Sequence, residues 1–331
     1  MGCAGLNRPE PPALTDAMPL PPPLIVLAGA TATGKTALSL EIASALRAHG
    51  VEPEIISADS RQVYRGMDIG TAKATPEERS RVPHHGLDLV DPDQPFSVAD
   101  FQVCAAEALS SMAARGAVAI LAGGTGFYLR AVAAGYPVDE LPWQPEVRAE
   151  LDRRLAADGL KPLVAELRSL APSRASTIDL KNPRRVVRAL EIARLRGDQP
   201  LPQPRGYGRP VLWLGLRVEQ DLLNRRIRDR AQAQFDAGLV EETRGLTARF
   251  DASAASFSGI GYAEAMAVIE GRLTRDAAIA TDARRNVALS RRQATWFRRE
   301  PDIIWLDATV SSPLTEATDL VERYLASEGT T

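Results

Sequence analysis

The chain has 331 residues, 45% hydrophobic and 25% charged, which is typical of a soluble globular protein with one large or two small domains. Its 40 Lys and Arg against 42 Asp and Glu give a net charge of -2, which argues against a protein dedicated to binding nucleic acid. Long apolar runs are absent and cysteine occurs only twice, so we expect no membrane contact, no disulfide framework and a cytoplasmic location.

Prolines crowd the first 23 residues, and that stretch lacks the apolar core of a signal peptide. Because proline fixes the backbone and removes a hydrogen-bond donor, neither helix nor strand is expected there. We predict that residues 1–23 form a disordered tail.

Unbroken apolar runs follow, separated by segments with helical periodicity. A run without alternation is typical of a strand buried on both faces, as in a parallel sheet flanked by helices. The chain therefore predicts a doubly wound α/β core. The expected strands are 24–28, 54–58 and 117–122, and the expected helices are 36–46, 100–114 and 127–134.

The hydrophobic pattern of the sequence changes at Tyr136, where strand-like apolar runs stop and helical periodicity continues to about Pro210. Strand-like runs resume at 211–216 and 302–306, so the sheet is expected to draw strands from both sides of this segment. We predict a core from 24–135 and 211–328, interrupted by an all-helical insertion domain at 136–210.

One loop matches the phosphate-binding pattern G-x-x-x-x-G-K-[ST], directly after a predicted strand and before a predicted helix. Its backbone N–H groups and the helix N-terminus favour a bound anion, so a di- or triphosphate is expected. Lys35 would reach the terminal phosphates, and the Thr36 hydroxyl would hold Mg²⁺. The predicted diphosphate-binding residues are Gly29, Ala30, Thr31, Ala32, Thr33, Gly34, Lys35 and Thr36, together with Arg130 farther along the chain.

Asp59 follows the second strand and faces the same crevice, because parallel strands end at one edge of the sheet. Three roles remain open for it: metal ligand, general base, or cap of the next segment. The strand near 118–121 ends in a Gly-Gly-Thr-Gly turn without an acid, which disfavours a hydrolytic ATPase. Thr125 in that turn, and Arg130 shortly after it, could meet a phosphate or substrate.

Arginine is concentrated in two stretches. Residues 181–196 hold six cations against one acid, Glu191, and residues 284–299 hold six arginines and no acid. The second set recurs in pairs every seven residues, which on a helix makes a nearly straight stripe able to follow a phosphate backbone. A third cluster, 225–230, could meet phosphate or pair with Asp221 and Asp229.

Several segments resemble the tRNA dimethylallyltransferases, also called tRNA isopentenyltransferases, in order and in spacing. The longest, SADSRQVYRGMDIGTAK, is highly specific on its own. The matching segments are residues 29–36, 57–73, 83–85, 91–92 with 96–101, 123–130, 182–192, 261–262 and 292–298.

The resemblance implies transfer of a dimethylallyl group from dimethylallyl diphosphate to N6 of adenosine 37, beside the tRNA anticodon. It implies a P-loop-type core, Mg²⁺, an anticodon stem-loop partner, Asp59 as base, Thr125 in the reaction channel and Lys35 at the leaving group. A monomer would suffice. The expected tRNA contacts are Asp59, Ser60, Arg61, Gln62, Thr125, Arg148, Arg184, Arg185, Arg188, Gly261, Tyr262, Arg291, Arg292, Gln293 and Arg298.

Three other functions stay open from the sequence: a small-molecule P-loop kinase, an RNA-binding module without catalysis, and an adenylate prenyltransferase acting on free AMP. The arginine stripe at 284–299 favours an RNA substrate over the first and third. His84 and His85 are expected to be loop residues, because no second cluster lies at metal-ligand spacing. Trp296, beside the stripe, could pack internally or stack on a base.

Overall fold

The computed structural model describes residues 20–141 and 144–329, so most of the expected N-terminal tail lies outside the described residues. Two compact units are present. One contains the chain up to Gly135 and from Gly206 onward, and the other is Tyr136–Arg205. The chain leaves and re-enters the first unit at one point, where the Gly206 N–H donates to the Ala134 carbonyl at 3.0 Å.

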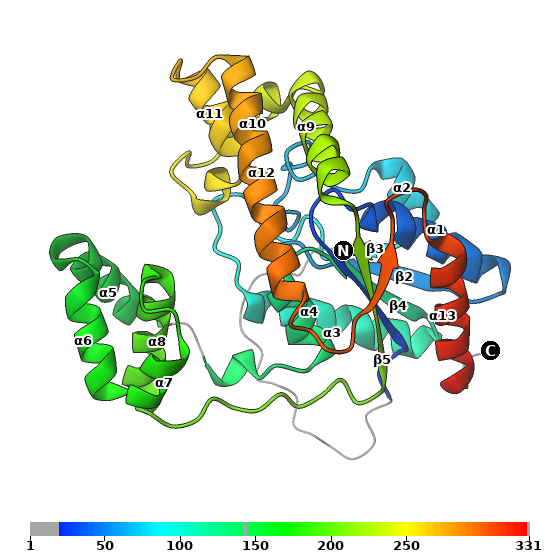
Figure 1. Ribbon diagram of the computed structural model, residues 1–331, viewed down its shortest axis with the longest axis horizontal. Coiled ribbons are helices and arrows are strands. Elements are labelled where there is room, and N and C mark those ends of the chain that lie inside the picture. Colours follow the sequence, from blue (N-terminus) through cyan, green and yellow to red (C-terminus); the bar gives the residue numbers. More distant parts are fainter. Residues whose placement is uncertain (1–19, 142–143, 330–331) are drawn as a thin grey trace. The chain divides into compact units, whose positions relative to one another are not determined.

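The first unit is built on a parallel sheet with strand order β3-β2-β4-β1-β5-β6 (Figure 1). This arrangement confirms the predicted α/β class, and β5 and β6 join the sheet from beyond the insertion. The short strand β3, paired with β2, was not expected. The bounds are β1 Leu24–Gly29, β2 Pro53–Ser57, β3 His84–His85, β4 Val118–Gly123, β5 Val211–Arg217 and β6 Ile304–Asp307.

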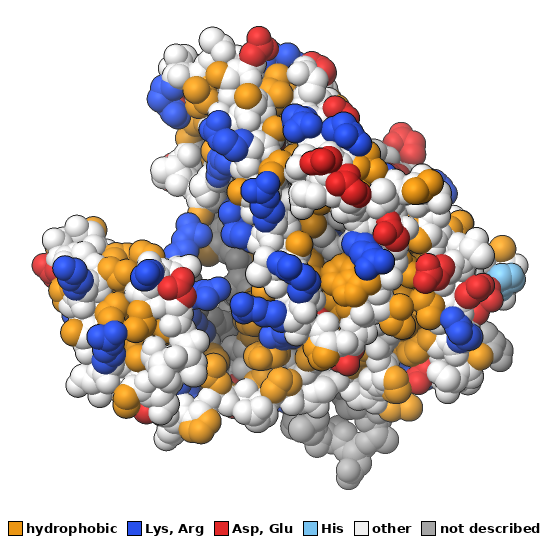
Figure 2. All heavy atoms as spheres, viewed as in Figure 1, with side chains coloured by type: hydrophobic (Ala, Val, Ile, Leu, Met, Phe, Trp, Pro, Cys, Tyr) orange, Lys and Arg blue, Asp and Glu red, His pale blue; other side chains and the backbone are white. Residues whose placement is uncertain are grey.

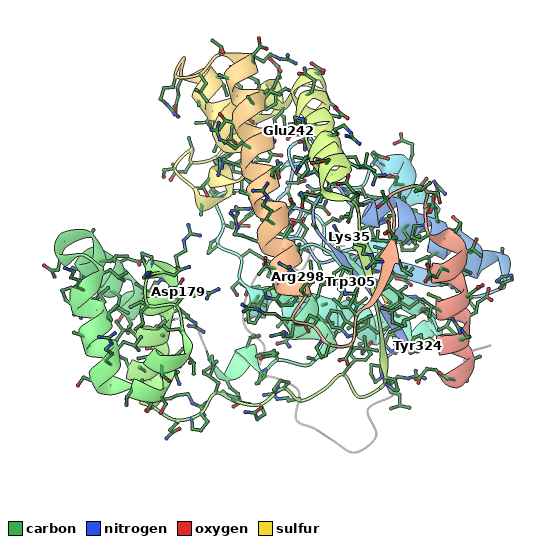
Figure 3. All side chains as sticks on the ribbon, in the orientation of Figure 1. Lys35, Asp179, Glu242, Arg298, Trp305 and Tyr324 are labelled. Carbon is green, nitrogen blue, oxygen red and sulfur yellow. The ribbon has the colours of Figure 1, made fainter. Side chains whose placement is uncertain are left out.

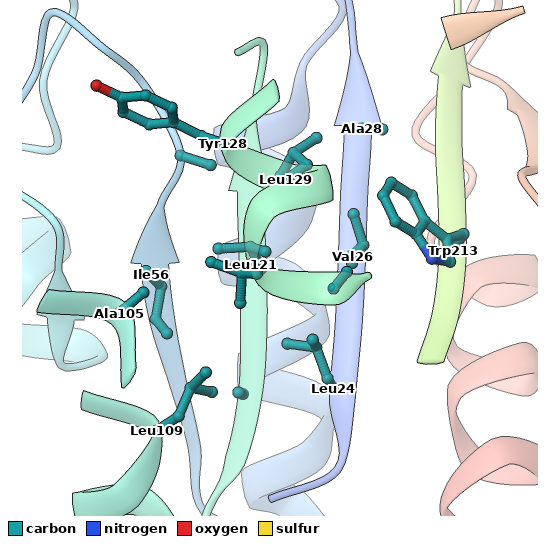
Figure 4. Close-up of a cluster of buried hydrophobic side chains, with 14 of the residues drawn as sticks. Leu24, Val26, Ala28, Ile56, Ala105, Leu109, Leu121, Tyr128, Leu129 and Trp213 are labelled. Atoms are coloured by element: carbon teal, nitrogen blue, oxygen red, sulfur yellow. The ribbon is translucent and has the colours of Figure 1, made fainter. Parts of the chain in front are cut away.

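Helices cover both faces of this sheet. On one face, strand residues such as Val26 and Leu121 pack against Leu109 and Leu129 from the α3 and α4 helices (Figure 4). On the other face, β1 residues pack against α1 and α13, with Ile42 among the fully buried side chains. The bounds are α1 Lys35–Ala48, α2 Pro76–Arg81, α3 Val98–Arg115, α4 Gly126–Ala133 and α13 Leu314–Ser327.

A further group of helices packs on the long loop that follows β2. Met67 of that loop is fully buried with Leu239 and Tyr262 of the helices. Glu242 accepts the backbone N–H of Ile69 at 2.9 Å and the Tyr262 hydroxyl at 2.6 Å, which fixes the loop to the helices. The bounds are α9 Gln220–Asp236, α10 Leu239–Thr247, η2 Ala255–Ser258, α11 Tyr262–Ile269 and α12 Arg275–Phe297.

The second unit, Tyr136–Arg205, has its own apolar core, in which Leu151, Leu167 and Leu190 are fully buried. No strand occurs among its described residues. This unit ends at Arg205, earlier than the expected boundary near residue 210. Its elements are η1 Val138–Glu140, α5 Pro145–Asp158, α6 Leu160–Leu170, α7 Pro172–Thr177 and α8 Pro183–Arg196.

The last residues of the expected disordered tail are ordered. Pro22 and Pro23 are buried against the core. Their carbonyls accept hydrogen bonds from the Tyr207 hydroxyl and the Ala119 N–H, both at 2.9 Å. Proline lacks a donor but keeps its acceptor, so a proline-rich stretch can still dock on a sheet. Within residues 20–141 and 144–329, none of the helices has the length and apolarity needed to cross a membrane.

Candidate active site at the carboxyl edge of the sheet

The phosphate loop connects β1 to α1. Ala32 at φ 63° and Gly34 at φ 98° adopt the left-handed region. Alternation of left-handed residues turns successive N–H groups toward one concavity, which is the geometry of an anion-binding nest. Only Gly34 adopts this conformation without strain, so the left-handed Ala32 marks a backbone held by its surroundings.

Lys35 folds back over this loop. Its Nζ donates to the Ala30 carbonyl at 2.7 Å, and the Thr33 hydroxyl donates to the same oxygen at 2.9 Å. Burial, together with the nearby Arg230 charge, lowers the pKa of Lys35 to about 8, while Asp59 opposes the shift. Lys35 is therefore mainly cationic at neutral pH and lies within electrostatic range of the Asp59 anion and the Arg230 cation.

Arg230 of α9 also reaches the loop, where its Nη2 donates to the Thr31 hydroxyl at 2.6 Å. Burial lowers its pKa, and Asp282 and Asp59 counteract this effect. The sequence left the 225–230 cluster undecided between phosphate and surface pairing. The structure places Arg230 at the phosphate loop, a position that only the packing of α9 could reveal.

Asp59 lies at the carboxyl end of β2, facing the phosphate loop. Its Oδ1 accepts the Arg61 N–H at 2.8 Å, so it does cap the following turn, one of the three roles left open. Its charge also acts on Lys35 and Arg230. Capping engages one carboxylate oxygen, and the same side chain remains within electrostatic range of both cations.

The turn after β4 brings Thr125 beside Asp59. The Ser60 N–H donates to the Thr125 hydroxyl at 3.1 Å, and the Thr125 N–H donates to the Ala58 carbonyl at 3.2 Å. A Cβ on Gly123 would lie 2.2 Å from that same carbonyl, so this close approach requires glycine. The Gly-Gly-Thr-Gly turn thus holds Thr125 against the segment that carries Asp59.

Arg130 does not join the phosphate loop, contrary to expectation. It forms an ion pair with Glu300 and lies 4.8 Å over the Trp296 ring. Trp296 itself packs edge-on against Phe297, with ring centroids 5.1 Å apart, and leaves no room for a Cβ on Gly126. Arg130 sits one helical turn into α4, and its side chain extends toward the end of α12. Trp296 therefore packs internally in this structure.

The two histidines of β3, and Gln62 of the loop that follows β2, have structural partners. His85 Nε2 lies 2.7 Å from Glu54, and His84 Nδ1 lies 2.7 Å from the Val82 carbonyl. Gln62 donates to the Thr71 carbonyl at 3.1 Å. No cluster of three or more His, Cys, Asp or Glu residues with metal-site spacing occurs in the described part of the chain.

Two expected tRNA contacts are placed differently. The Tyr262 side chain is only 2% exposed and donates its hydroxyl to Glu242, and burial raises its pKa. Gly261 is buried as well, with φ at 92°. A Cβ at Gly70 would lie 2.5 Å from the Tyr262 ring, so this pair fixes the loop after β2. The Tyr262 side chain is thus not available to RNA here.

Helix α12 carries the predicted arginine stripe on its exposed side. Arg291, Arg292 and Arg298 are exposed and form no ion pair with any described residue, and Arg298 donates to Thr295 at 3.1 Å. Arg285 differs, because it pairs with the buried Glu264. Blue side chains, which on this helix are all arginines, line the visible face of α12 in Figure 2, and Arg298 lies at the helix end nearer the core in Figure 3.

The sequence of this chain is similar to those of known proteins over most of its length. The family model described as IPP transferase matches residues 62–300. A tRNA dimethylallyltransferase of Roseiflexus sp. is 42% identical over 92% of this chain and 99% of its own length, and one of Thermus thermophilus is 42% identical over 85% and 91%. The chain belongs to the IPP transferase family.

Solved structures agree with this family assignment. A tRNA isopentenylpyrophosphate transferase from Bacillus halodurans is 36% identical, with a TM-score of 0.68 over 93% of this chain and 98% of its own. A eukaryotic dimethylallyltransferase shares the fold with a TM-score of 0.72 at 23% identity. These relatives favour the IPP transferase assignment over the kinase alternative, and they support the P-loop-type core.

In this IPP transferase the arginines of the insertion are mostly paired. Arg188 lies 2.9 Å and Arg148 3.4 Å from the fully buried Glu191, which also accepts the Gln144 N–H at 2.7 Å. Their expected role in tRNA contact therefore competes with an internal one. Arg184 and Arg185, in contrast, are exposed and have no ion pair among the described residues.

Proposed function

We propose that this IPP transferase transfers the dimethylallyl group of dimethylallyl diphosphate to N6 of adenosine 37 in the anticodon stem-loop of tRNA. The observation that carries the proposal is the meeting of Asp59, Lys35 and Thr125 at one edge of the sheet, in a chain of this family. Such a transfer requires an acceptor for the N6 proton and a cation at the diphosphate leaving group, and Asp59 and Lys35 can supply them, with Thr125 beside them.

The proposed reaction exchanges one bond for another. The bond between the allylic carbon and the diphosphate oxygen breaks, the bond from that carbon to N6 forms, and the N6 proton goes to Asp59. The products are N6-isopentenyladenosine and diphosphate. Lys35, Arg230 and the N–H groups of the nest would stabilise the charge that develops on the leaving group, because all of them lie at the phosphate loop that would hold the diphosphate.

The start of α1, beside the phosphate loop, offers a ligand for a magnesium ion. Thr36 lies exposed on the first turn of α1, next to the nest, and no cluster of protein carboxylates competes for the metal within the described residues. Mg²⁺ is usually held by few protein ligands, substrate phosphates and water. We propose that the Thr36 hydroxyl holds it, and that the ion, when bound, neutralises charge on the diphosphate.

The RNA side of the proposal depends on the exposed face of α12. An adenine must leave its stack to reach a site formed by loops at the edge of a sheet. The protein therefore has to bind the RNA backbone on either side of that base. Arg291, Arg292 and the C-cap residue Arg298 offer exposed cations that form no ion pair within the described residues. We propose that a monomer binds the stem-loop along this face.

The proposal is tested by offering labelled dimethylallyl diphosphate with three acceptors: tRNA, its isolated anticodon stem-loop and AMP. We expect label in tRNA and in the stem-loop, none in AMP, and loss of transfer when the metal is chelated. A stem-loop with guanosine at position 37 serves as the matched control and should stay unlabelled. Transfer to AMP but not to RNA would contradict the proposal.

A further inference from the structure

Gln293 of α12 bridges the two loops that form the site. Its Oε1 accepts the Thr31 N–H at 2.9 Å, and its Nε2 donates to the Gly124 carbonyl at 3.0 Å. One side chain thereby spans from the phosphate loop to the turn that carries Thr125. Both ends of its amide are used, so the amide orientation follows from the two partners.

The first of these partners lies at the rim of the anion-binding nest. The left-handed residues Ala32 and Gly34 follow Thr31, so the concavity is formed by N–H groups after it. Thr31 is held twice, with its N–H on Gln293 and its hydroxyl on Arg230 at 2.6 Å. Helices α9 and α12 thus fix the same residue from two sides.

The second partner shows that the loop is shaped around this glutamine. A Cβ on Gly124 would lie 2.5 Å from Gln293 Nε2, and one on Gly126 would lie 2.3 Å from the Trp296 ring. Gln293 and Trp296 are three residues apart and share a face of α12. That face docks on the glycine turn, while Arg291 and Arg292 are exposed.

We propose that Gln293 is a positioning residue that fixes the spacing between the phosphate loop and the Thr125 turn, and so between the diphosphate and the attacking amine. This role replaces the direct tRNA contact expected for Gln293, and it rests on the proposed function. Geometry near the reacting atoms is sensitive, since a displacement of about 1 Å costs on the order of 10²-fold in rate.

A double-mutant cycle tests the role. Gln293→Ala removes both hydrogen bonds, and Gly124→Ala pushes the flexible end of Gln293 away without altering its chemistry. Each single variant should lower kcat, at saturating tRNA and dimethylallyl diphosphate, by on the order of 10- to 100-fold. The double variant should be no worse than Gln293→Ala, because the second change removes an interaction that is already lost. Additive losses would overturn the proposal.

A binding measurement separates positioning from RNA contact. Affinity for tRNA without dimethylallyl diphosphate should change less than about twofold in Gln293→Ala, whereas Arg291→Gln, the contrast on the exposed face of α12, should weaken it and reduce its salt dependence. Weaker tRNA binding by Gln293→Ala with kcat preserved would overturn the proposal and return Gln293 to RNA contact.

Hydrogen exchange gives a readout that does not depend on catalysis. The Thr31 amide should be protected in the native chain and should exchange at least tenfold faster in Gln293→Ala, while amides in the centre of β1 stay protected in both. If the native chain shows no prenyl transfer, the proposed function fails, yet this bridge can still be tested. Unchanged exchange at Thr31 would overturn the positioning role itself.

Discussion

The two arginine-rich helices, α8 in the insertion and α12 in the core unit, look alike in sequence and differ in structure. On α8, Arg188 pairs with buried Glu191, and Arg194 forms ion pairs with Glu150 and Glu166. On α12, Arg291 and Arg292 have no ion pair with any described residue. Two of these three acids lie on other helices, Glu150 on α5 and Glu166 on α6, so only the folded structure shows which arginines of a run are neutralised and which offer charge to a ligand.

Among these changes, removing Glu191, the buried acid at the centre of the insertion, should have the largest effect on stability. Glu191→Ala leaves Arg148 and Arg188 without their shared partner and the Gln144 N–H without an acceptor. Breaking a buried pair is costly, so we expect α8 amides to open with about 3 kcal/mol less free energy, measured by hydrogen exchange on the full chain. Asp158→Ala, an exposed acid on α5, is the control and should change little.

Asp282, the buried acid of α12, should affect stability in the opposite direction: its charge lowers the stability of the folded state. Asp282 is 1% exposed, Asn286 donates to its Oδ1 at 2.7 Å, and its Oδ2 has no hydrogen-bond partner within the described residues. Burial and Glu264 raise its pKa to about 6, with Arg230, Arg285 and Asn286 opposing. The folded state then holds this proton more tightly than the unfolded state, so stability rises as the pH falls through 6 toward 4.

The raised pKa of Asp282 predicts how its replacement changes the free energy of unfolding. At pH 7 the charged, poorly paired carboxylate costs stability, and Asp282→Asn should raise the free energy of unfolding by about 1–3 kcal/mol. The gain should vanish near pH 4, where the native carboxyl is already protonated. Urea unfolding at pH 7 and pH 4 measures both. A variant that is less stable at pH 7 would show that Asp282 is better paired than the structure indicates.

The unpaired arginines should matter for RNA rather than for stability. Arg291→Gln and Arg298→Gln should each make tRNA affinity less dependent on salt. The magnitude of the slope of log affinity against log salt should fall by up to about one unit, because each substitution removes one cation that contacts a phosphate. Filter binding over a range of salt concentrations measures this slope. Slopes identical to that of the native chain would mean that α12 presents an ordinary solvated face.

The smallest effect is expected for a paired arginine. Arg194→Gln removes contacts to Glu150 and Glu166 at the surface of the insertion, which should cost about 0.5 kcal/mol and leave the salt slope for tRNA unchanged. The same binding series provides the measurement. If Arg194→Gln lowers the slope as much as Arg291→Gln does, pairing is no guide to RNA contact and the contrast between the helices fails.

Much of the core could be predicted from the sequence. Uninterrupted apolar runs identified β1, β2, β4, β5 and β6, since a strand buried on both faces has no alternation. The G-x-x-x-x-G-K-[ST] pattern between a predicted strand and a predicted helix identified the phosphate loop, because its glycines permit a turn that directs several N–H groups at an anion. The short β3 strand was missed because two residues carry no periodicity.

The rest of the site depends on packing that no local pattern reports. Arg230 faces the phosphate loop only because α9 packs there, and Arg130, adjacent to a site motif, turns toward Glu300 instead. Tyr262 lies in a matched segment, yet its ring is buried against Gly70. The resemblance located these segments, but it could not say which side chains point inward.

The assignment of the active site is tested most directly by single-turnover transfer of label from dimethylallyl diphosphate to tRNA. Asp59→Asn and Lys35→Ala should each lower the rate by about 10²–10³-fold, or about 2.7–4 kcal/mol, with tRNA still bound. Asp93→Asn, at an exposed acid outside the phosphate loop, the Asp59 segment and the Thr125 turn, should match the native rate. Near-native transfer by Asp59→Asn or Lys35→Ala would contradict the assignment of these residues to amine activation and leaving-group stabilisation.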